Sequence, residues 1–180
     1  NLEIANSITG VRLTDGAAVK FSGLSLVNNA TGMEVNNAAP VISQSQIQGS
    51  SILGISNLTP ATTVLATGNW WGNAAGPMDA TGNPAGLGDT VSTGVAYSSW
   101  LTEIPLIDPS IKVAGNPAFT DQQTVTLELY CRNAVEYRVV EGTNFTGALF
   151  QPMAVTVPFS LSAGDGSKQI SVQYRASTGN

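Results

Sequence analysis

The chain offers few side chains that could carry out chemistry. Its 180 residues contain no histidine and a single cysteine, Cys131. A Ser/His/Asp or Cys/His relay and a histidine-ligated zinc site are therefore excluded within the chain. Cys131 lies in a strand pattern without a basic neighbour to lower its pKa, so we expect a buried, unreactive thiol.

Carboxylates are the next candidates for catalysis. Glycoside hydrolysis needs two carboxyl groups about 5 to 10 Å apart in a cleft. The outward-facing acids of the first half are Glu3 and Glu34, and we expect Glu34 to pair with Arg12 instead. Lyase chemistry on acidic sugars would need clustered acids and a base, and only Arg12 and Lys20 are available there. We therefore expect no catalysis in this fragment, although an enzyme remains an alternative.

Three oxygen-bearing side chains, Asp79, Asn83 and Asp89, lie in a glycine-rich segment. Calcium takes six to eight oxygen ligands, which flexible loops can supply, so these residues are a candidate metal site. The alternative is that they only form turns, which Asp and Asn favour. We favour turn formation; no cofactor is predicted, and calcium is the ion that these residues would suit.

Four aromatic side chains could stack on sugar rings: Trp70, Trp71, Tyr97 and Trp100. Neighbouring residues of a strand face opposite sides, so one of Trp70 and Trp71 should be buried, and the other exposed or covered by a loop. The four rings are thus a candidate carbohydrate-binding site. We favour the alternative that they cap an apolar core.

A repeat indicates the elements that position these residues. Apolar side chains recur about every 20 to 22 residues, which is typical of stacked repeats that bury their apolar faces against each other. Val11 and Leu13 return as Met33 and Val35 and again as Leu53 and Ile55; Phe21 returns as Ile42 and Val64; Leu26 returns as Ile47 and then near Trp70. The short strands suit a parallel β-helix, in which successive coils lie about 4.8 Å apart.

The repeat also predicts a register. Val11 aligns with Met33, which places Arg12 beside Glu34 in the adjacent coil as an exposed pair. Asn37 should stack over Asn57 as an amide ladder, unless both only form turns. The pattern ends at residues 69–72, and we expect residues 72–94 to be a loop that covers the open end of the coils.

The second half follows a different pattern. Apolar residues alternate with a period of two in four segments, residues 125–131, 135–139, 155–161 and 170–174, with turn signals between them. This predicts a small antiparallel β-sandwich. Net charge changes as well, from two bases and seven acids in residues 1–108 to five of each in residues 109–180. We therefore divide the chain into a parallel β-helix end with its cap (1–108) and a sandwich (109–180).

Composition excludes several classes of function. The net charge is −5, so the basic footprint needed for nucleic acid is missing, and an anionic membrane surface is disfavoured. No apolar run approaches the 18 or so residues needed to span a bilayer, so no membrane insertion is expected. Asn29, Asn57 and Asn144 each begin an Asn-x-Thr glycosylation sequon, although chance matches are expected in a chain rich in Asn and Thr.

Residues 1–107 resemble the end of a right-handed parallel β-helix domain from bacterial or archaeal cell-envelope proteins. The resembling motifs are the Gly-Asn-Trp-Trp-Gly run at residues 68–72, Gly76-Pro77, the Gly-Asp-Thr-Val run at residues 88–91 and the Tyr-Ser-Ser-Trp-Leu run at residues 97–101. The resemblance implies that the Asn-Trp-Trp-Gly motif closes the helix. It also implies a carbohydrate-related protein: a lyase, hydrolase, epimerase, adhesin or surface scaffold.

Residues 109–180 resemble a bacterial immunoglobulin-like repeat of extracellular proteins. The resembling segments are residues 136–138, 145–147, 151–152, 161–168, 172–175 and 179–180. Phe150 stands where the family often has Trp, and Ala176 stands where it often has Asp after the Arg. The second departure weakens any expectation of a carboxylate-tied final turn or of an ion site.

Together these features predict a structural fragment of a modular protein, secreted or on the cell surface of a bacterium. Its expected partners are neighbouring domains of the same protein and a polysaccharide or cell-wall component. Two alternatives remain: the C-terminal portion of a β-helix polysaccharide lyase or hydrolase, and a sugar-binding module that uses the aromatic residues.

Overall fold

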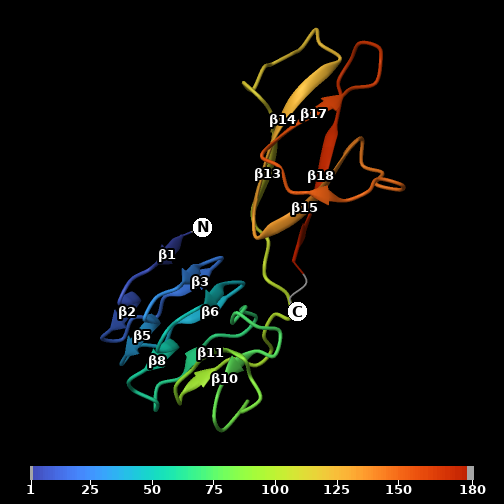
Figure 1. The fold of residues 1–180 in the computed structure, drawn as a ribbon. Helices are drawn as coiled ribbons and strands as arrows, with labels where there is room; N and C mark the ends of the chain where they lie inside the picture. Colours follow the sequence, from blue (N-terminus) through green and yellow to red (C-terminus); the bar gives the residue numbers. More distant parts are fainter. Residues whose placement is uncertain (1, 178–180) are drawn as a thin grey trace. The chain divides into compact units, whose positions relative to one another are not determined.

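The computed structural model describes residues 2–177, and every regular element within them is a β-strand (Figure 1). The prediction of an all-β protein is therefore confirmed. The strands form two compact units, one in residues 2–105 and one in Leu106–Ser177. Residues 2–177 contain no helix of the length and apolar character needed to cross a bilayer.

The first unit is built from three sheets of short parallel strands. Sheet 1 contains β1 (Glu3–Ala5), β4 (Ser25–Val27) and β7 (Gln46–Gln48). Sheet 2 contains β2 (Thr9–Thr14), β5 (Thr31–Asn36) and β8 (Leu53–Asn57). Sheet 3 contains β3 (Lys20–Ser22), β6 (Val41–Ser43), β9 (Val64–Leu65) and β12 (Val95–Ala96).

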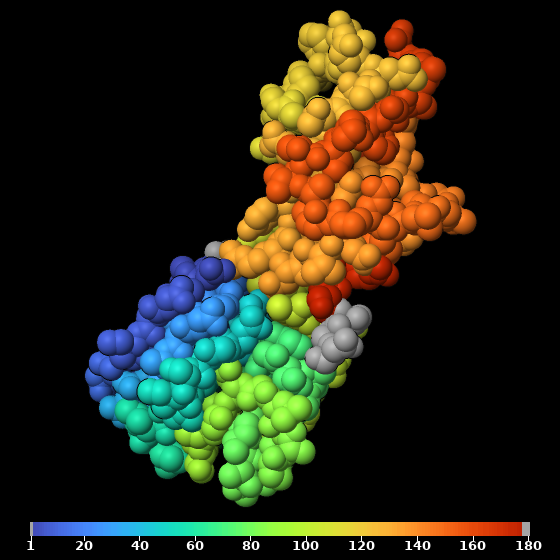
Figure 2. Space-filling model, viewed as in Figure 1, coloured from blue at the N-terminus to red at the C-terminus, as the bar shows by residue number. Residues whose placement is uncertain are grey.

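The chain visits the three sheets in rotation, and we call one passage through sheets 1, 2 and 3 a circuit. Successive circuits lie side by side, as β2, β5 and β8 do in Figure 1 and as the bands from blue to green do in Figure 2. Val11 pairs with Met33, and Arg12 pairs with Glu34. The predicted register is thus confirmed, and Arg12 Nε lies 2.8 Å from Glu34 Oε1.

The register also corrects two predicted alignments. Ile55, not Leu53, pairs with Met33, so the spacing in sheet 2 stays at 22 residues from Val11 onwards. In sheet 3, Leu65 pairs with Val41, so Val64 does not align with Ile42 as predicted. The two errors have different causes. In sheet 2, both Leu53 and Ile55 are apolar and the wrong one of the two was aligned with Met33, although the spacing is constant. In sheet 3, the connection before β9 is longer than the one before β6, and the apolar pattern does not reveal where the extra residues lie.

The apolar side chains of the circuits point into one core. Leu26, Met33, Ile42, Ile47 and Ile55 are each 0 % exposed. They come from all three sheets, so a single core fills the space that the sheets enclose. Burial of this apolar surface stabilises the unit, since no circuit can bury its own apolar face alone.

A column of glycines lies where successive strands of sheet 2 approach each other closely. A Cβ atom on Gly10 would lie 2.5 Å from the carbonyl oxygen of Gly32, and a Cβ atom on Gly32 would lie 2.5 Å from that of Gly54. Real Cβ contacts essentially never reach so short a distance. The spacing of 22 residues repeats the register of the sheet, so successive strands place these glycines beside one another.

The expected ladder of Asn37 over Asn57 does not form, because Asn57 pairs with Val35. Two other asparagines connect the circuits instead. Asn29 Nδ2 donates to the Ile4 carbonyl at 3.0 Å, and Asn29 Oδ1 accepts from the Ser7 amide at 2.9 Å.

Asn69 repeats this arrangement further along the unit. Its Nδ2 donates to the Ile42 carbonyl at 2.8 Å, and its Oδ1 accepts from the Ser45 amide at 3.0 Å. Asn29 and Asn69 are 1 % and 0 % exposed. These buried amides therefore satisfy backbone groups one circuit earlier, at the turn between sheets 1 and 2 for Asn29 and between sheets 3 and 1 for Asn69.

The loop expected at residues 72–94 is more ordered than predicted. A fourth circuit begins at Trp70, which bridges to Gln46 in sheet 1, and continues with Val91, which bridges to Ile55 in sheet 2. The fourth circuit then reaches β12 in sheet 3. Residues between Trp70 and Val91 form an insertion that contains the paired strands β10 (Pro77–Met78) and β11 (Gly88–Thr90).

The second unit contains two antiparallel sheets of three strands. One has the order β13 (Ile107–Val113), β14 (Thr124–Arg132) and β17 (Thr156–Ser160). The other has the order β16 (Gln151–Pro152), β15 (Ala134–Glu141) and β18 (Ile170–Ala176). The chain passes from the first sheet to the second at Asn133, which has a φ of 68°.

Alternate residues of these strands build a shared core. Val125, Leu127 and Leu129 of β14 are buried and pack with Tyr137 of β15 and Val157 of β17. The period of two predicted for these segments is confirmed in β14, whose buried and exposed residues alternate. Cys131 is buried, and desolvation raises the pKa of its thiol, in line with the expected unreactive cysteine. Val155, by contrast, was predicted to follow the same alternation but is 72 % exposed, and it lies just before β17.

Candidate functional site

The predicted aromatic residues lie at the fourth circuit and its insertion. Trp70 is 5 % exposed and Trp71 is 0 % exposed. Trp70 Nε1 donates to Gln48 Oε1 at 2.7 Å, which ties the fourth circuit to the third. The sequence predicts one buried ring and a second ring that is either exposed or covered by a loop. Both rings are buried, so the exposed alternative is wrong. Neither ring offers a face for stacking on a sugar.

Tyr97 and Trp100 form a second aromatic group. Their ring centroids lie 6.2 Å apart with the planes tilted by 40°. Tyr97 is buried, whereas Trp100 is half-buried and donates from Nε1 to the Ala74 carbonyl at 3.0 Å. The Trp100 ring lies against Gly76, which has a φ of 77° and where a side chain would collide with the indole. Among the four predicted rings, Trp100 is thus the one with appreciable exposure.

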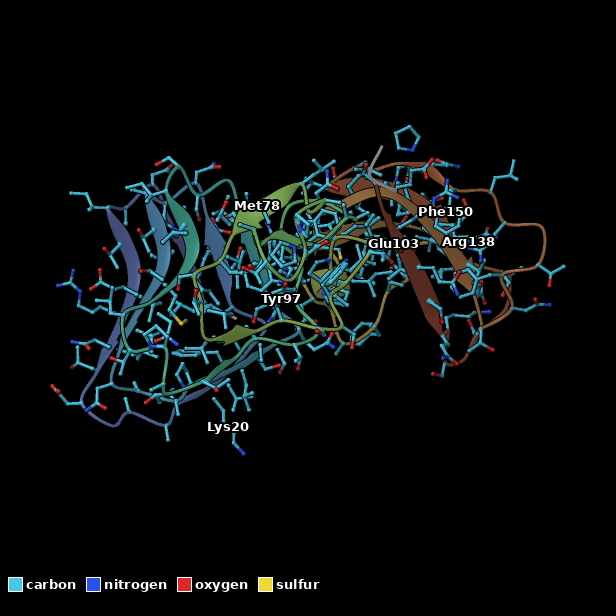
Figure 3. All side chains as sticks on the ribbon, turned by 90° about the horizontal axis from the view of Figure 1, so that it is seen from below. Lys20, Met78, Tyr97, Glu103, Arg138 and Phe150 are labelled. Atoms are coloured by element: carbon cyan, nitrogen blue, oxygen red, sulfur yellow. The ribbon has the colours of Figure 1, made fainter. Side chains whose placement is uncertain are left out.

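Tyr97 is held by Asp79. The Tyr97 hydroxyl donates to Asp79 Oδ2 at 2.9 Å (Tyr97 is labelled in Figure 3). Burial, and then this hydrogen bond and the carboxylate charge, raise the pKa of Tyr97 to about 12. The bond from the Thr81 amide, and then that from Tyr97, lower the pKa of Asp79. The pair therefore keeps a neutral phenol and an ionised carboxylate, which is a stabilising arrangement and not a proton-transfer pair poised near neutrality.

Asp79 and Asn83 close a turn within the insertion. Their backbones exchange two hydrogen bonds, from the Asp79 amide at 3.2 Å and from the Asn83 amide at 3.0 Å. Asn83 Nδ2 donates to the carbonyls of Ala75 and Pro77 at 2.9 and 2.8 Å. These contacts use both residues to shape the turn, as the turn-forming alternative expects.

Asp89 lies in β11 of the same insertion, and its side chain contacts the third circuit instead of the turn at Asp79. Its Oδ2 accepts from the Ser50 amide at 3.0 Å. Desolvation by burial raises the pKa of this carboxyl, against the lowering effect of the bonds from Ser50. Within residues 2–177, no group of three or more His, Cys, Asp or Glu side chains is placed to hold a metal ion.

The outer face of β15 and β18 carries a group of residues that the sequence did not single out as a site. The Arg138 guanidinium lies 4.6 Å from the Phe150 ring centroid (both residues are labelled in Figure 3). The Arg175 guanidinium lies 4.3 Å from the same centroid. Arg175 Nε donates to Glu136 Oε2 at 2.5 Å. The alternation of Glu136 and Arg138 along the strand could have indicated a shared face. Cation–π stacking thus engages both guanidinium groups, and Arg175 is also paired with Glu136.

One hollow lies in the second unit. It has a volume of about 770 Å³ and is bounded by residues 117–123 and 161–168, with Val125 and Ile170 among its lining residues. Phe119 lies in its wall and is 89 % exposed. The hollow opens where the strands end, and none of the residues predicted for a site lines it.

Comparison with protein-family models, with curated proteins and with solved structures found no match for this chain.

Proposed function

We propose that this chain is a structural segment of a modular extracellular or cell-surface protein. Residues 1–108 would be the end of a right-handed parallel β-helix with its cap, and residues 109–180 an immunoglobulin-like sandwich. In this function the stacked circuits act as a stiff spacer, and the sandwich joins them to neighbouring modules or to a polysaccharide of the cell wall.

The observation that carries the proposal is the constant register of sheet 2. Val11, Met33 and Ile55 lie one above another at steps of 22 residues, and all three strands run in the same direction. A stack of this kind gains stability from contacts between neighbouring circuits, so its length is set by the number of circuits. Such an element suits a role that depends on reach and stiffness.

The state of the polar residues supports a structural role over a catalytic one. Asp79 and Asp89 accept hydrogen bonds from backbone amides, and Glu34 pairs with Arg12. A catalytic carboxyl pair needs two acids facing one another across an open cleft. These three acids instead each have a partner that fixes a turn or a register.

Deleting one circuit tests the proposed stack. Ser25 of sheet 1 pairs with Gln46, so removal of residues 24–44 joins Gly23 to Ser45 at equivalent positions. Lys20, Val41, Leu65 and Ala96 form one column in sheet 3. Spin labels on Lys20→Cys and Ala96→Cys, in a Cys131→Ala background, should come about 4.8 Å closer after the deletion while the protein still unfolds cooperatively. A deletion variant that fails to fold, or that keeps the original distance, contradicts the stack.

A parallel assay tests the role. The full-length chain is incubated with neutral and acidic polysaccharides, with soluble products as the readout. We expect no products, since Asp79, Asp89 and Glu34 are each engaged in structural contacts. Release of products that is abolished by Asp79→Asn or Asp89→Asn would favour the enzyme alternative and overturn the scaffold proposal.

Sugar binding is a second candidate, favoured by the exposed part of the Trp100 ring. Aromatic faces bind sugars through their apolar surface, and Gly76 leaves room for the indole to lie flat on the insertion. Saturable binding on a glycan array that is lost in Trp100→Ala would support it. Leu87→Ala is the matched control, because Leu87 is 74 % exposed in the same insertion and is not aromatic.

A further inference from the structure

The three Asn-x-Thr sequons of this chain are not equivalent in the folded protein. Asn29, Asn57 and Asn144 each stand two residues before a threonine. Glycosylation at such a sequon forms a bond from the side-chain amide nitrogen to a bulky glycan, which only a surface position can carry. Access to Nδ2 therefore decides which sequons are acceptors once the chain has folded.

Asn29 is closed to modification. It is 1 % exposed, and its Nδ2 donates to the Ile4 carbonyl at 3.0 Å. Its Oδ1 accepts from the Ser7 amide at 2.9 Å. A glycan on this nitrogen would break the contact between two circuits and would have to occupy space inside the stack.

Asn57 is closed as well, although its local geometry is that of a turn. Its Oδ1 accepts from the Thr59 amide at 3.0 Å, as in an Asx-turn. However, the residue is 4 % exposed, and its Nδ2 donates to the carbonyls of Thr62 and Gly94 at 2.9 and 3.0 Å. The turn therefore does not make Asn57 an acceptor, because its side chain is buried and its Nδ2 is bonded.

Asn144 has the same turn on the open surface of the second unit. Its Oδ1 accepts from the Thr146 amide at 3.0 Å, and both residues are exposed. The carbonyl side of the amide is therefore occupied, which leaves Nδ2 directed away from the turn. Within residues 2–177, no hydrogen bond is formed by Nδ2 of Asn144, in contrast to Asn29 and Asn57.

The loop that contains Asn144 is held in place by contacts with Arg138 of β15. The Arg138 guanidinium lies 5.2 Å from the Phe145 ring centroid and donates from Nη1 to the Ala148 carbonyl at 3.1 Å. Gln173 Oε1 in turn accepts from Arg138 Nε at 2.8 Å. Asn144 therefore lies in a loop with defined contacts to β15, and these contacts do not involve the side-chain amide nitrogen of Asn144.

We propose that Asn144 is an N-glycosylation site and that it is the one sequon of this chain open to glycan transfer after folding. The glycan donor is an oligosaccharide linked through phosphate to a lipid. Asn144 Nδ2 attacks the anomeric carbon, forming the nitrogen–carbon bond as the carbon–oxygen bond to phosphate breaks. The lipid phosphate leaves with the electron pair, and the amide proton passes to a base of the transferase. In the organism, this modification rests on the extracellular location proposed above.

The test is transfer of the glycan to the purified, folded full-length chain. The protein is incubated with an oligosaccharyltransferase and its lipid-linked oligosaccharide, and intact mass and peptide mapping are the readouts. We expect a gain of one oligosaccharide at Asn144 and none at Asn29 or Asn57. A urea-unfolded sample of the same protein should gain glycans at the other two sequons as well.

Matched variants identify the acceptor. Asn144→Gln and Thr146→Ala should each abolish the mass gain, whereas Thr146→Ser should retain it because the hydroxyl is kept. Near-ultraviolet circular dichroism checks that these exposed substitutions leave the fold unchanged.

A folded protein that takes no glycan at Asn144 overturns the proposal, and the unfolded sample then shows whether the fold or the local sequence blocks transfer. Transfer to Asn29 or Asn57 in the folded protein overturns it equally. Because the enzyme and its donor are supplied in the assay, failure here leaves the proposed extracellular role untouched. That role is tested separately by the circuit deletion and the polysaccharide assay.

Discussion

At the scale of single residues, buried polar side chains hold the circuits in register. Asn29 and Asn69 each bridge a carbonyl and an amide of the preceding circuit. A buried backbone group that loses its partner costs stability because water cannot replace the bond. Asparagine fits this place because one side chain carries a donor and an acceptor.

Replacing Asn69 with Ala should therefore be costly. The substitution removes the partners of the Ser45 amide and the Ile42 carbonyl in the core, so we expect a loss of about 3 kcal/mol in the free energy of unfolding. Urea denaturation measures it. Asn36→Ala is the control, because the exposed Asn36 makes only a solvated hydrogen bond to Thr59, and we expect a change below about 0.5 kcal/mol. Equal losses in the two variants would contradict the bridging role.

Asp89 should make stability depend on pH. Its pKa is raised in the folded state, so the folded protein binds the proton more tightly than the unfolded chain does. The ionised carboxylate therefore lowers the free energy of unfolding. This loss of stability is absent when the pH is below the pKa of the unfolded chain, about 4, and is complete once the pH exceeds the raised pKa of the folded protein. Asp89→Asn, whose amide oxygen can still accept from Ser50, should thus be more stable than the parent at neutral pH and no more stable in acid.

Asp79 should have the opposite effect on the pH dependence of stability and serves as the comparison for Asp89. Its pKa is lowered in the folded state, so the ionised carboxylate stabilises the protein when the pH is above the pKa of the unfolded chain. This stabilisation is lost as the pH falls through the lower pKa of the folded protein. Denaturation midpoints between pH 3 and 7 measure both variants. A stability gain for Asp79→Asn at neutral pH, or none for Asp89→Asn, would contradict these assignments.

At the scale of elements, close approach of successive strands restricts the residues of sheet 2. The backbone carbonyl of each following circuit lies where a side chain on Gly10 or Gly32 would be. The same strands direct their apolar side chains inward and charged side chains such as that of Arg12 outward. The element is therefore specified by a glycine and an apolar pattern together.

Gly32→Ala should strain this column. The added methyl group would lie 2.5 Å from the Gly54 carbonyl oxygen, so the backbone must shift, and we expect a loss of about 2 kcal/mol or more. Gly16→Ala is the control: Gly16 has a φ of 79° and nothing within 4 Å, so it should lose only about 1 kcal/mol from the unfavourable backbone conformation. Thermal unfolding of both variants measures the difference, and a smaller loss for Gly32→Ala would count against the close approach.

At the scale of the whole molecule, the two units have separate cores. Ile47 belongs to the core of the first unit and Leu127 to that of the second, and both are 0 % exposed. The cores differ in kind, since one is enclosed by parallel strands from successive circuits and the other by two antiparallel sheets. Each unit can therefore unfold by losing its own core.

Calorimetry of the full-length chain should then show two transitions. Ile47→Ala and Leu127→Ala each remove a buried aliphatic side chain, at a cost of about 2 to 5 kcal/mol. We expect each substitution to lower one transition by several degrees and to leave the other in place, because neither residue belongs to the other core. One transition that both substitutions lower equally would show that the units unfold together.

The sequence by itself determined the all-β class, the pairing of Arg12 with Glu34 and the alternation of β14, because each depends on a short, repeated pattern of apolar residues. Glycines at positions 10, 32 and 54 carried the same spacing and could have fixed the alignment of Ile55 with Met33.

Only the tertiary structure decided the rest. The fourth circuit resumes at Val91 after an insertion, where Val91 pairs with Ile55 of the third circuit. The local sequence pattern does not reveal this pairing, because the two residues lie far apart in the chain. Burial of both Trp70 and Trp71, and the closing of two sequons but not that at Asn144, depend on which segments pack over them. Side-chain access is set by contacts between residues far apart in the chain, and a local sequence pattern contains no record of those contacts.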